Sequence, residues 1–135
     1  VKDRRKGFTA KDYQTLKDAI ADLSPQLSDL ITLGAYTGCR IEELCSLKLE
    51  AVTDDRIEIE DAKTEAGLRT SPIHTHIRQL VARLRDTSTD GYLLSGLTFN
   101  KYGDRSNAIG KRFGRLKSKC DYGSDYVFHS FRKGV

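Results

Sequence analysis

The sequence of 135 residues has no methionine, two prolines and only three cysteines. Three cysteines without a C-x-x-C pair argue against a disulfide framework and a structural zinc site, and they favour a reducing intracellular setting. No apolar run approaches the roughly 20 residues that a membrane-spanning helix needs, and no signal peptide opens the chain. Because methionine is absent, we expect that Val1 is not the natural start and that the sequence is a fragment of a longer chain.

The length and composition suit one polar domain. A chain of this size can bury a hydrophobic core without disulfides or metal ions. Hydrophobic residues make up 38% and charged residues 31%, against a usual charged share of about 25%. The apolar residues are too many and too periodic for a disordered chain, so we expect a single folded domain.

Charge is distributed unevenly along the chain. Residues 1–11 carry a net charge of +4, residues 12–100 a net charge of −6, and residues 101–135 a net charge of +6. Basic ends around an acidic middle favour a surface that binds a polyanion such as nucleic acid. Ordinary solvated helix faces would give the same counts, so charge alone leaves both interpretations open.

Apolar spacing and capping residues predict a mainly helical chain. Thr9 and Ser24 are expected to cap the first two helices, and Gly38 to end the second. The first predicted helix runs through Leu23, the second starts at Pro25, and a short third passes through Ile41, Leu44 and Cys45. A fourth is capped by Thr75 and passes through Ile77 and Leu84. A basic helix then buries Ile109, Phe113, Leu116 and Cys120, and a last helix opens at 126–132.

Alternating residues between these helices predict short strands. Ile57 and Ile59 alternate with charged residues, and residues 69–73 form a second candidate that Pro72 confines to an edge or an end. Val52 and its neighbours are expected to add a third short strand. The predicted fold class is therefore mainly α with a small antiparallel β-sheet.

The sequence gives little support for a metal site or for a nucleophilic cysteine. His74 and His76 could ligate a metal ion, but no acidic or thiol partner lies at motif spacing. Cys39, Cys45 and Cys120 lie next to helical apolar positions and are expected in the core rather than as nucleophiles. We expect no metal and no cofactor.

Three segments contain residues suited to binding or transferring a phosphate. The first is Thr37-Gly38-Cys39-Arg40-Ile41-Glu42-Glu43-Leu44, in which Arg40 lies at the start of a helix and Glu43 one turn later. The second places Lys63 on a hairpin arm that continues into Arg69-Thr70-Ser71-Pro72-Ile73. The third is His129-Ser130-Phe131-Arg132, whose spacing puts an imidazole and a guanidinium on one helix face. Each segment alone would pass for an ordinary surface feature.

Taken in this order, the three segments resemble the catalytic domain of tyrosine recombinases, the phage-integrase family. The pattern of that family is T-G-x-R-x-x-E-L, then a hairpin lysine followed by R-x-x-P-[LI], then H-x-x-R. The resemblance implies a mostly helical fold with a small antiparallel sheet, and DNA strand exchange through a covalent phosphotyrosine without metal or cofactor. It also implies roles for five residues: Arg40 and Arg132 bind the phosphate, Glu43 supports them, Lys63 is the general acid, and His129 hydrogen-bonds the phosphate or takes a proton from the nucleophile.

The chain departs from the family pattern in one respect. The nucleophilic tyrosine of the family follows the H-x-x-R motif, and no tyrosine follows Arg132 here. We therefore expect residues 1–135 to be a single partial catalytic domain, without the amino-terminal DNA-clamping domain and the tyrosine segment, and inactive alone. A non-catalytic DNA-binding remnant and a relative of type IB topoisomerases are the alternatives.

The expected partners are double-stranded DNA and further protomers of the same recombinase, without a membrane. We expect a cytoplasmic, DNA-associated protein of bacterial or phage origin. The basic helix and the residue before it supply the expected DNA contacts, namely Arg105, Lys111, Arg112 and Arg115.

Overall fold

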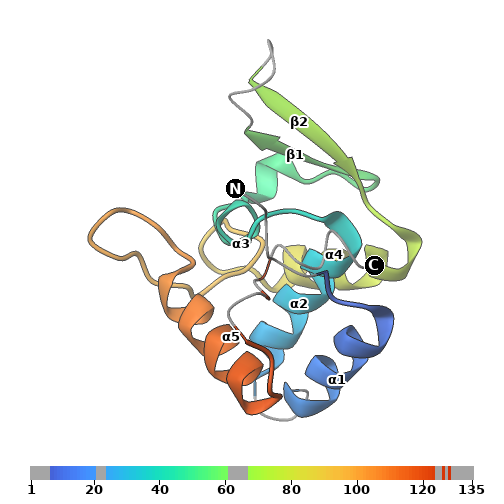
Figure 1. The fold of residues 1–135 in the computed structure, drawn as a ribbon. Helices are drawn as coiled ribbons and strands as arrows, with labels where there is room; N and C mark the ends of the chain where they lie inside the picture. The colour runs from blue at the N-terminus through green and yellow to red at the C-terminus, as the bar shows by residue number, and fades with distance from the viewer. Residues whose placement is uncertain (1–6, 21–23, 61–66, 124–125, 127, 129–135) are drawn as a thin grey trace.

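The computed structural model describes residues 7–20, 24–60, 67–123, 126 and 128. Figure 1 shows a body of helices from which a two-stranded hairpin projects. The elements in chain order are α1 (Ala10–Ile20), α2 (Pro25–Thr37), α3 (Ile41–Cys45), the 3-10 helix η1 (Leu49–Ala51), β1 (Arg56–Glu60), β2 (Leu68–Pro72), the 3-10 helix η2 (Thr75–Ile77), α4 (Arg78–Thr87) and α5 (Asn107–Lys119). The expected fold class is confirmed. None of the helices in these ranges is both long and apolar enough to cross a membrane.

The predicted caps of the first two helices are confirmed. Thr9 Oγ1 accepts a hydrogen bond from the Asp12 backbone N–H, and Asp12 Oδ2 accepts one from the Thr9 N–H, so the two residues cap α1 reciprocally. Ser24 caps α2, and Pro25 occupies its first turn. Gly38 ends α2 with a φ of 69°, a left-handed conformation that glycine adopts without steric cost.

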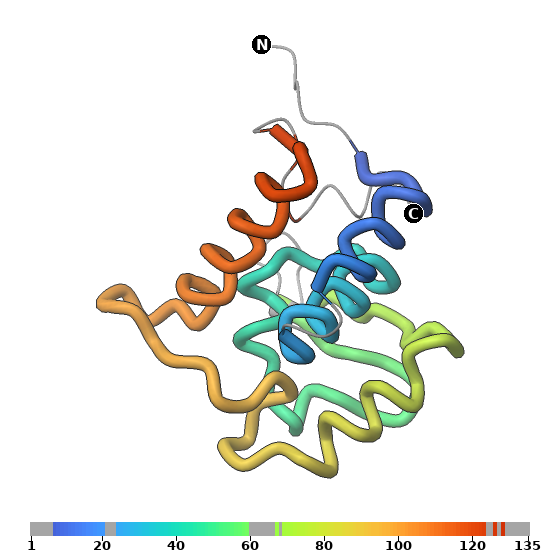
Figure 2. Tube along the Cα trace, turned by 90° about the horizontal axis from the view of Figure 1, so that it is seen from below, coloured from blue at the N-terminus to red at the C-terminus, as the bar shows by residue number. Residues whose placement is uncertain are grey.

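Helix α2 is the centre of the core. It lies between α1 and α5 (Figures 1 and 2), and both of these helices contact it. Seven of its 13 residues are buried. Gly34 matters here because a Cβ at this position would overlap the ring of Phe128, which packs directly on α2 and edge-on against Phe113. The close approach of Phe128 anchors the chain just before the H-x-x-R segment.

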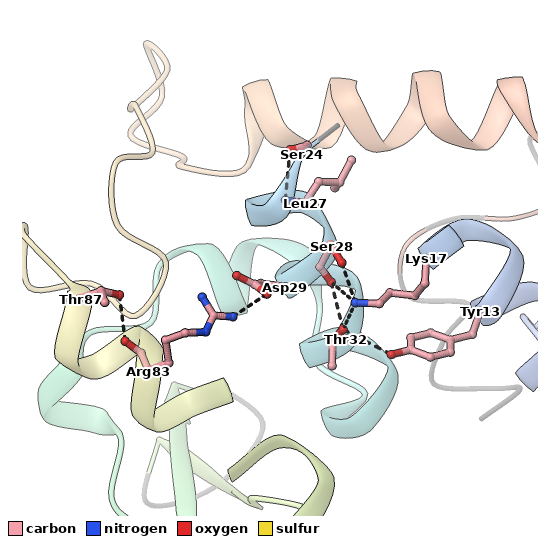
Figure 3. A network of polar contacts seen from close by, with 9 residues as sticks. All are labelled: Tyr13, Lys17, Ser24, Leu27, Ser28, Asp29, Thr32, Arg83 and Thr87. Carbon is pink, nitrogen blue, oxygen red and sulfur yellow. Dashed lines mark hydrogen bonds and ion pairs between the residues drawn. The ribbon is translucent and has the colours of Figure 1, made fainter. Parts of the chain in front are cut away.

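A polar network joins α2 to its neighbours on both sides (Figure 3). The Lys17 ammonium of α1 donates to Ser28 Oγ at 2.6 Å and to Thr32 Oγ1 at 2.7 Å. Burial lowers the pKa of Lys17, and the nearby Asp29 carboxylate only partly offsets this. Asp29 in turn accepts a hydrogen bond from Arg83 of α4 at 3.0 Å. The network therefore fixes α1 and α4 relative to the central helix.

The sheet in the described part of the chain has two strands rather than three. The register runs from Arg56 opposite Pro72 to Glu60 opposite Leu68. Ile57 and Ile59 are buried, as their alternation predicted. The expected strand at Val52 is wrong, because its N–H donates to the Leu49 carbonyl and closes a 3-10 turn; Val52 keeps only an isolated bridge with Ile57.

The fourth helix begins differently from the prediction. Thr75 does not cap it but starts η2, and the imidazole of His74 accepts the capping hydrogen bond from the His76 N–H at 3.1 Å. The apolar spacing is confirmed, since Val81 and Leu84 of α4 are buried. The rings of His74 and His76 stack on each other, and no cluster of metal-ligating side chains occurs in the described ranges.

Candidate functional site

Arg40 lies at the start of α3, immediately after the turn that ends α2. The left-handed Gly38 reverses the chain, and Arg40 follows in an extended conformation as the residue just before the helix. Its side chain is exposed. Within the described ranges, no side chain forms an ion pair or hydrogen bond with its guanidinium. Among the residues that the structure describes, none pairs with the Arg40 guanidinium, which is therefore available to bind an external anion.

Glu43 fixes the backbone of Arg40 rather than its side chain. Glu43 Oε1 accepts a hydrogen bond from the Arg40 N–H at 2.7 Å. This bond satisfies a donor that the helix start would otherwise leave open. The structure therefore agrees with a supporting position for Glu43, next to Arg40 but not paired with its charge.

Arg69 of β2 joins the hairpin to this helix, a contact that the sequence analysis did not assign. Its Nη2 lies 3.0 Å from Glu43 Oε1, the same oxygen that binds the Arg40 N–H. Nη2 also lies 3.8 Å from the sulfur of Cys39. The sequence feature that could have indicated this contact is the R-x-x-P motif, which places an arginine on the strand after the hairpin lysine, within reach of α3. Arg69 thus connects the hairpin to the residue that positions Arg40.

Glu42, the neighbour of Glu43, binds the start of α5. Its carboxylate accepts hydrogen bonds from the backbone N–H groups of Arg105 and Ser106, at 3.1 and 2.9 Å, and from the hydroxyl of Ser46. Burial alone would raise the pKa of Glu42, but these hydrogen bonds outweigh it and lower the pKa below its usual value. No sequence pattern indicated this role, because most of the partner groups belong to the backbone.

Arg105 is not a DNA contact, which corrects the prediction. The residue is only 1% exposed. Its guanidinium donates to the carbonyls of Cys45 and Leu94 and to Asp90 Oδ2, and it lies 3.6 Å from the centre of the Tyr92 ring. A charged side chain enters a core only where such partners replace water, so Arg105 is a structural residue.

The other predicted DNA contacts lie on α5, which packs against the start of α3. A Cβ at Gly110 would lie 3.7 Å from Ile41 Cδ1, so the two helices nearly touch there. Lys111 and Arg115 line a shallow hollow on the outer side of α5, and Lys111 is exposed. Arg112 is half-buried, and its terminal nitrogens donate to the side chains of Ser24 and Gln26 at the start of α2. Lys111 and Arg115 therefore offer charge to the outside, whereas Arg112 is engaged with α2.

A groove of about 660 Å³ extends from Arg40 to the loop before α5. Its lining includes Arg40 and Glu43 of the α3 region and Phe99, Gly103 and Arg105 of the loop, together with Lys48 and the carboxylates of Glu42, Glu50 and Glu58. The Arg40 side chain and the loop thus border the same open space.

The remaining site residues lie outside the described part of the chain. Lys63 falls in the segment between β1 and β2, and His129 and Arg132 follow Phe128. Their predicted roles stay predictions. Of the described residues near these two segments, Arg69 of β2 contacts Glu43 of α3, and Phe128 packs on α2.

The cysteines lie where the sequence analysis expected them. Cys39 and Cys45 are buried and Cys120 is half-buried, all as free thiols. Burial raises the pKa of Cys45 to about 12, which keeps its thiol protonated at neutral pH. A buried, protonated thiol is a poor nucleophile, so these positions are consistent with core packing.

Comparison with known proteins finds similarity to phage integrases. No family model matches the chain. The integrase of Enterobacteria phage P21 is 22% identical over 143 residues, which cover 95% of this chain and 38% of that protein. The integrase of Escherichia phage HK022 is 33% identical over 84 residues, which cover 62% of this chain and 23% of that protein. The chain thus spans well under half the length of these curated relatives.

Solved structures give the fold. The catalytic core of lambda integrase superposes with a TM-score of 0.71 and 18% identity, covering 96% of this chain and 80% of that one. The chain has the fold of the lambda integrase catalytic core. The Tn1549 transposon integrase, solved in complex with circular intermediate DNA, matches with a TM-score of 0.69 and 21% identity over 98% of this chain and 53% of that one. The resemblance inferred from the motifs is therefore confirmed at the level of the fold, and within this fold Arg40 and Glu43 lie together at a helix start.

Proposed function

We propose that the chain is part of the catalytic domain of a DNA strand transferase that performs site-specific recombination or integration. The observation that carries the proposal is the placement of Arg40 within a recombinase fold, where Glu43 fixes its backbone and its guanidinium is exposed. A DNA phosphodiester gains negative charge on its non-bridging oxygens as it reacts. A permanently charged, forked guanidinium held in place stabilises that charge.

The family pattern supplies the remaining steps of the proposed reaction. Arg40 and Arg132 bind the non-bridging oxygens, and His129 hydrogen-bonds the phosphate or accepts the proton of the nucleophile. A tyrosine hydroxyl, not among residues 1–135, attacks phosphorus and forms the 3′-phosphotyrosine bond. The bond from phosphorus to the 5′ oxygen breaks, and Lys63 donates a proton to that oxygen.

Double-stranded DNA is the proposed partner, and the outer side of α5 is the proposed contact. Lys111 and Arg115 line the hollow there, and α5 adjoins the helix that begins after Arg40. Lambda integrase has been solved as a tetramer bound to a Holliday junction. By analogy, further protomers of the same recombinase are proposed to assemble on the DNA with this one.

The DNA contact can be tested on the chain itself. We expect it to bind a labelled duplex in an anisotropy titration with little sequence preference, and log affinity should fall with log salt by about 0.9 per phosphate contacted. The double variant Lys111→Ala/Arg115→Ala should lower this slope by about 2. Arg78→Ala on α4 is the matched control, because it removes an exposed arginine from a different helix. Binding that does not respond to salt would contradict the proposal.

The chemistry can be tested in a form of the protein that extends past Val135 through the next tyrosine. On a nicked half-site, this form should accumulate a covalent 3′ adduct that is visible by denaturing electrophoresis. Arg40→Ala should slow adduct formation by about 100-fold or more, as loss of a transition-state donor does, with most DNA affinity retained. An adduct that forms at the unaltered rate would show that Arg40 has no catalytic role. DNA binding without any adduct would favour the non-catalytic alternative.

A further inference from the structure

The loop that precedes α5 exposes two aromatic side chains. We call residues 97–104 the tip loop; it projects from the body beyond the start of α5 (Figures 1 and 2). Tyr102 is 75% exposed and Phe99 is 59% exposed. Large exposed apolar side chains within one short loop commonly mark a binding surface.

The tip loop has a defined conformation. Asn100 Oδ1 accepts hydrogen bonds from the N–H groups of Tyr102 and Asp104, both at 2.9 Å, and the Asn100 N–H donates to the Asp104 carbonyl at 2.9 Å. Gly103 supplies the left-handed φ of 82° that such a tight turn requires. The turn therefore presents its side chains in a fixed arrangement, which lowers the entropic cost of binding.

Buried contacts hold the base of the loop. The Arg105 guanidinium packs on the Tyr92 ring, and the centre of the Phe99 ring lies 5.7 Å away from it. Arg105 also donates to the carbonyl of Leu97. At the tip, the Lys101 ammonium lies 5.0 Å from the centre of the Tyr102 ring, so a cation and an aromatic face lie side by side.

The position of the tip loop relates it to the proposed DNA surface. Phe99 and Gly103 line the same groove as Arg40, whose lining also includes Lys48 and four glutamates. Helix α5, with Lys111 and Arg115, follows the loop directly in the chain. A duplex that places one phosphate at Arg40 and runs its backbone along α5 would have the tip loop beside it. The exposed cations that favour DNA over a second copy of the chain as the occupant are Lys101 of the loop and Lys111 and Arg115 of α5.

We infer that the tip loop is a second DNA contact, in which Lys101 binds a backbone phosphate and the Tyr102 ring packs against the neighbouring sugar and base edge. This inference rests on the proposed function and extends it to a surface outside the catalytic motifs. Neither group reads a base pair by a fixed donor and acceptor pattern, so the contact strengthens binding to any sequence and specifies none.

Two substitutions separate the contributions of the loop. In anisotropy titrations of the chain with a labelled duplex, Lys101→Ala should lower the salt slope by about 0.9, which corresponds to one phosphate. Tyr102→Ala should weaken binding about fivefold with the slope unchanged, because it removes an uncharged packing contact. Tyr102→Phe should keep most of the affinity. Arg78→Ala on α4 serves again as the control for loss of a surface charge.

A fluorescent probe reports the contact directly. The sequence contains no tryptophan, so Tyr102→Trp introduces a single one at the tip. Its emission should be quenched when duplex is added at low salt and recover at high salt. Gln79→Trp, at an exposed position of α4, should give no such change.

The outcomes distinguish this inference from the function on which it rests. If the unaltered chain binds DNA with a steep salt slope but the loop variants and the tryptophan probe at the tip show no change, the inference is overturned and the proposed function stands. If the unaltered chain does not bind DNA, both fail. If sedimentation shows a dimer that Tyr102→Ala abolishes, and DNA leaves the probe unaffected, the loop is a contact between copies of the chain and the DNA assignment is overturned.

Discussion

Two adjacent glutamates of α3 make junctions of different character. Glu42 joins α3 to the start of α5 through the backbone N–H groups of Arg105 and Ser106, beside the Arg105 side chain, which is 1% exposed. It also accepts a hydrogen bond from the hydroxyl of Ser46, which ends α3. Glu43 joins α3 to the hairpin through one carboxylate oxygen, shared between the Arg40 N–H and Arg69. The Arg69 and Glu43 side chains are 29% and 17% exposed. The first junction is densely bonded and the second is partly open to water.

The difference fits the work proposed for each region. A DNA-binding helix must keep a fixed position relative to the arginine that holds the phosphate, because a small misplacement is costly in phosphoryl transfer. The hairpin carries the proposed general acid, Lys63, which has to approach the leaving oxygen. A partly exposed ion pair costs little to break and remake. We therefore expect α5 to be rigid relative to α3, and the hairpin to be adjustable.

Removal of the Arg105 side chain should have the largest effect. Arg105→Ala removes the guanidinium that donates to the Cys45 and Leu94 carbonyls, and it takes one of several donors from the Asp90 carboxylate; breaking a buried charged contact of this kind costs about 3–5 kcal/mol. Urea unfolding followed by circular dichroism measures the loss. Because small domains have only about 5–15 kcal/mol of stability, Arg105→Lys, which keeps one donor, should be measured alongside and give an intermediate loss.

Lys111→Ala is the matched control for Arg105. It removes an exposed cation of α5 and should change the free energy of unfolding by less than about 0.5 kcal/mol. Equal losses for the two variants would mean that the buried junction is no stronger than the surface of α5.

Glu42→Gln should have a smaller effect that depends on pH. The variant loses a charged acceptor and should be less stable by about 1 kcal/mol at pH 7. Because the folded pKa of Glu42 is lowered, its contribution is complete above the unfolded pKa of about 4.3 and disappears as the pH falls through the folded pKa. Urea unfolding from pH 7 down to about pH 3 should therefore show the two proteins converging below the unfolded pKa.

Other carboxylates titrate in the same range, so the difference between the two proteins is the informative quantity. Hydrogen bonds also lower the pKa of Asp12 and Asp90 against the opposing effect of burial. These groups are present in both proteins and cancel in the comparison. A gap that stays constant down to about pH 3 would show that the ionised form of Glu42 adds nothing to the junction.

The sequence predicted those parts of the fold that depend on local signals. Thr9, Ser24 and Gly38 set helix boundaries through contacts within a few residues, and each is confirmed. At the site, the T-G-x-R-x-x-E-L motif correctly placed Arg40 at a helix start with Glu43 one turn later, because both lie within a single turn of chain.

The failures come from contacts between distant segments. The sequence analysis predicted Arg105 to be a DNA contact on the surface. Nothing near it in the sequence indicates that it is buried against the carbonyls of Cys45 and Leu94, which are 60 and 11 residues away. Val52 is a residue type favoured in strands, but its N–H donates to the Leu49 carbonyl in a 3-10 turn. Glu42 and Glu43 look alike in sequence, and only the folded positions of α5 and β2 give them different partners.

The hairpin junction should respond least to substitution. Arg69→Ala removes a partly exposed ion pair with Glu43, and such pairs contribute about 0–1 kcal/mol to the free energy of unfolding. Amide hydrogen exchange is the sensitive measurement, because it reports local opening separately from global unfolding. We expect faster exchange at the β1–β2 amides and unchanged exchange in α5, with Arg69→Lys partly restoring protection. Exchange that also accelerates in α5 would show that the two junctions of α3 are coupled, and the contrast between a fixed helix and an adjustable hairpin would fail.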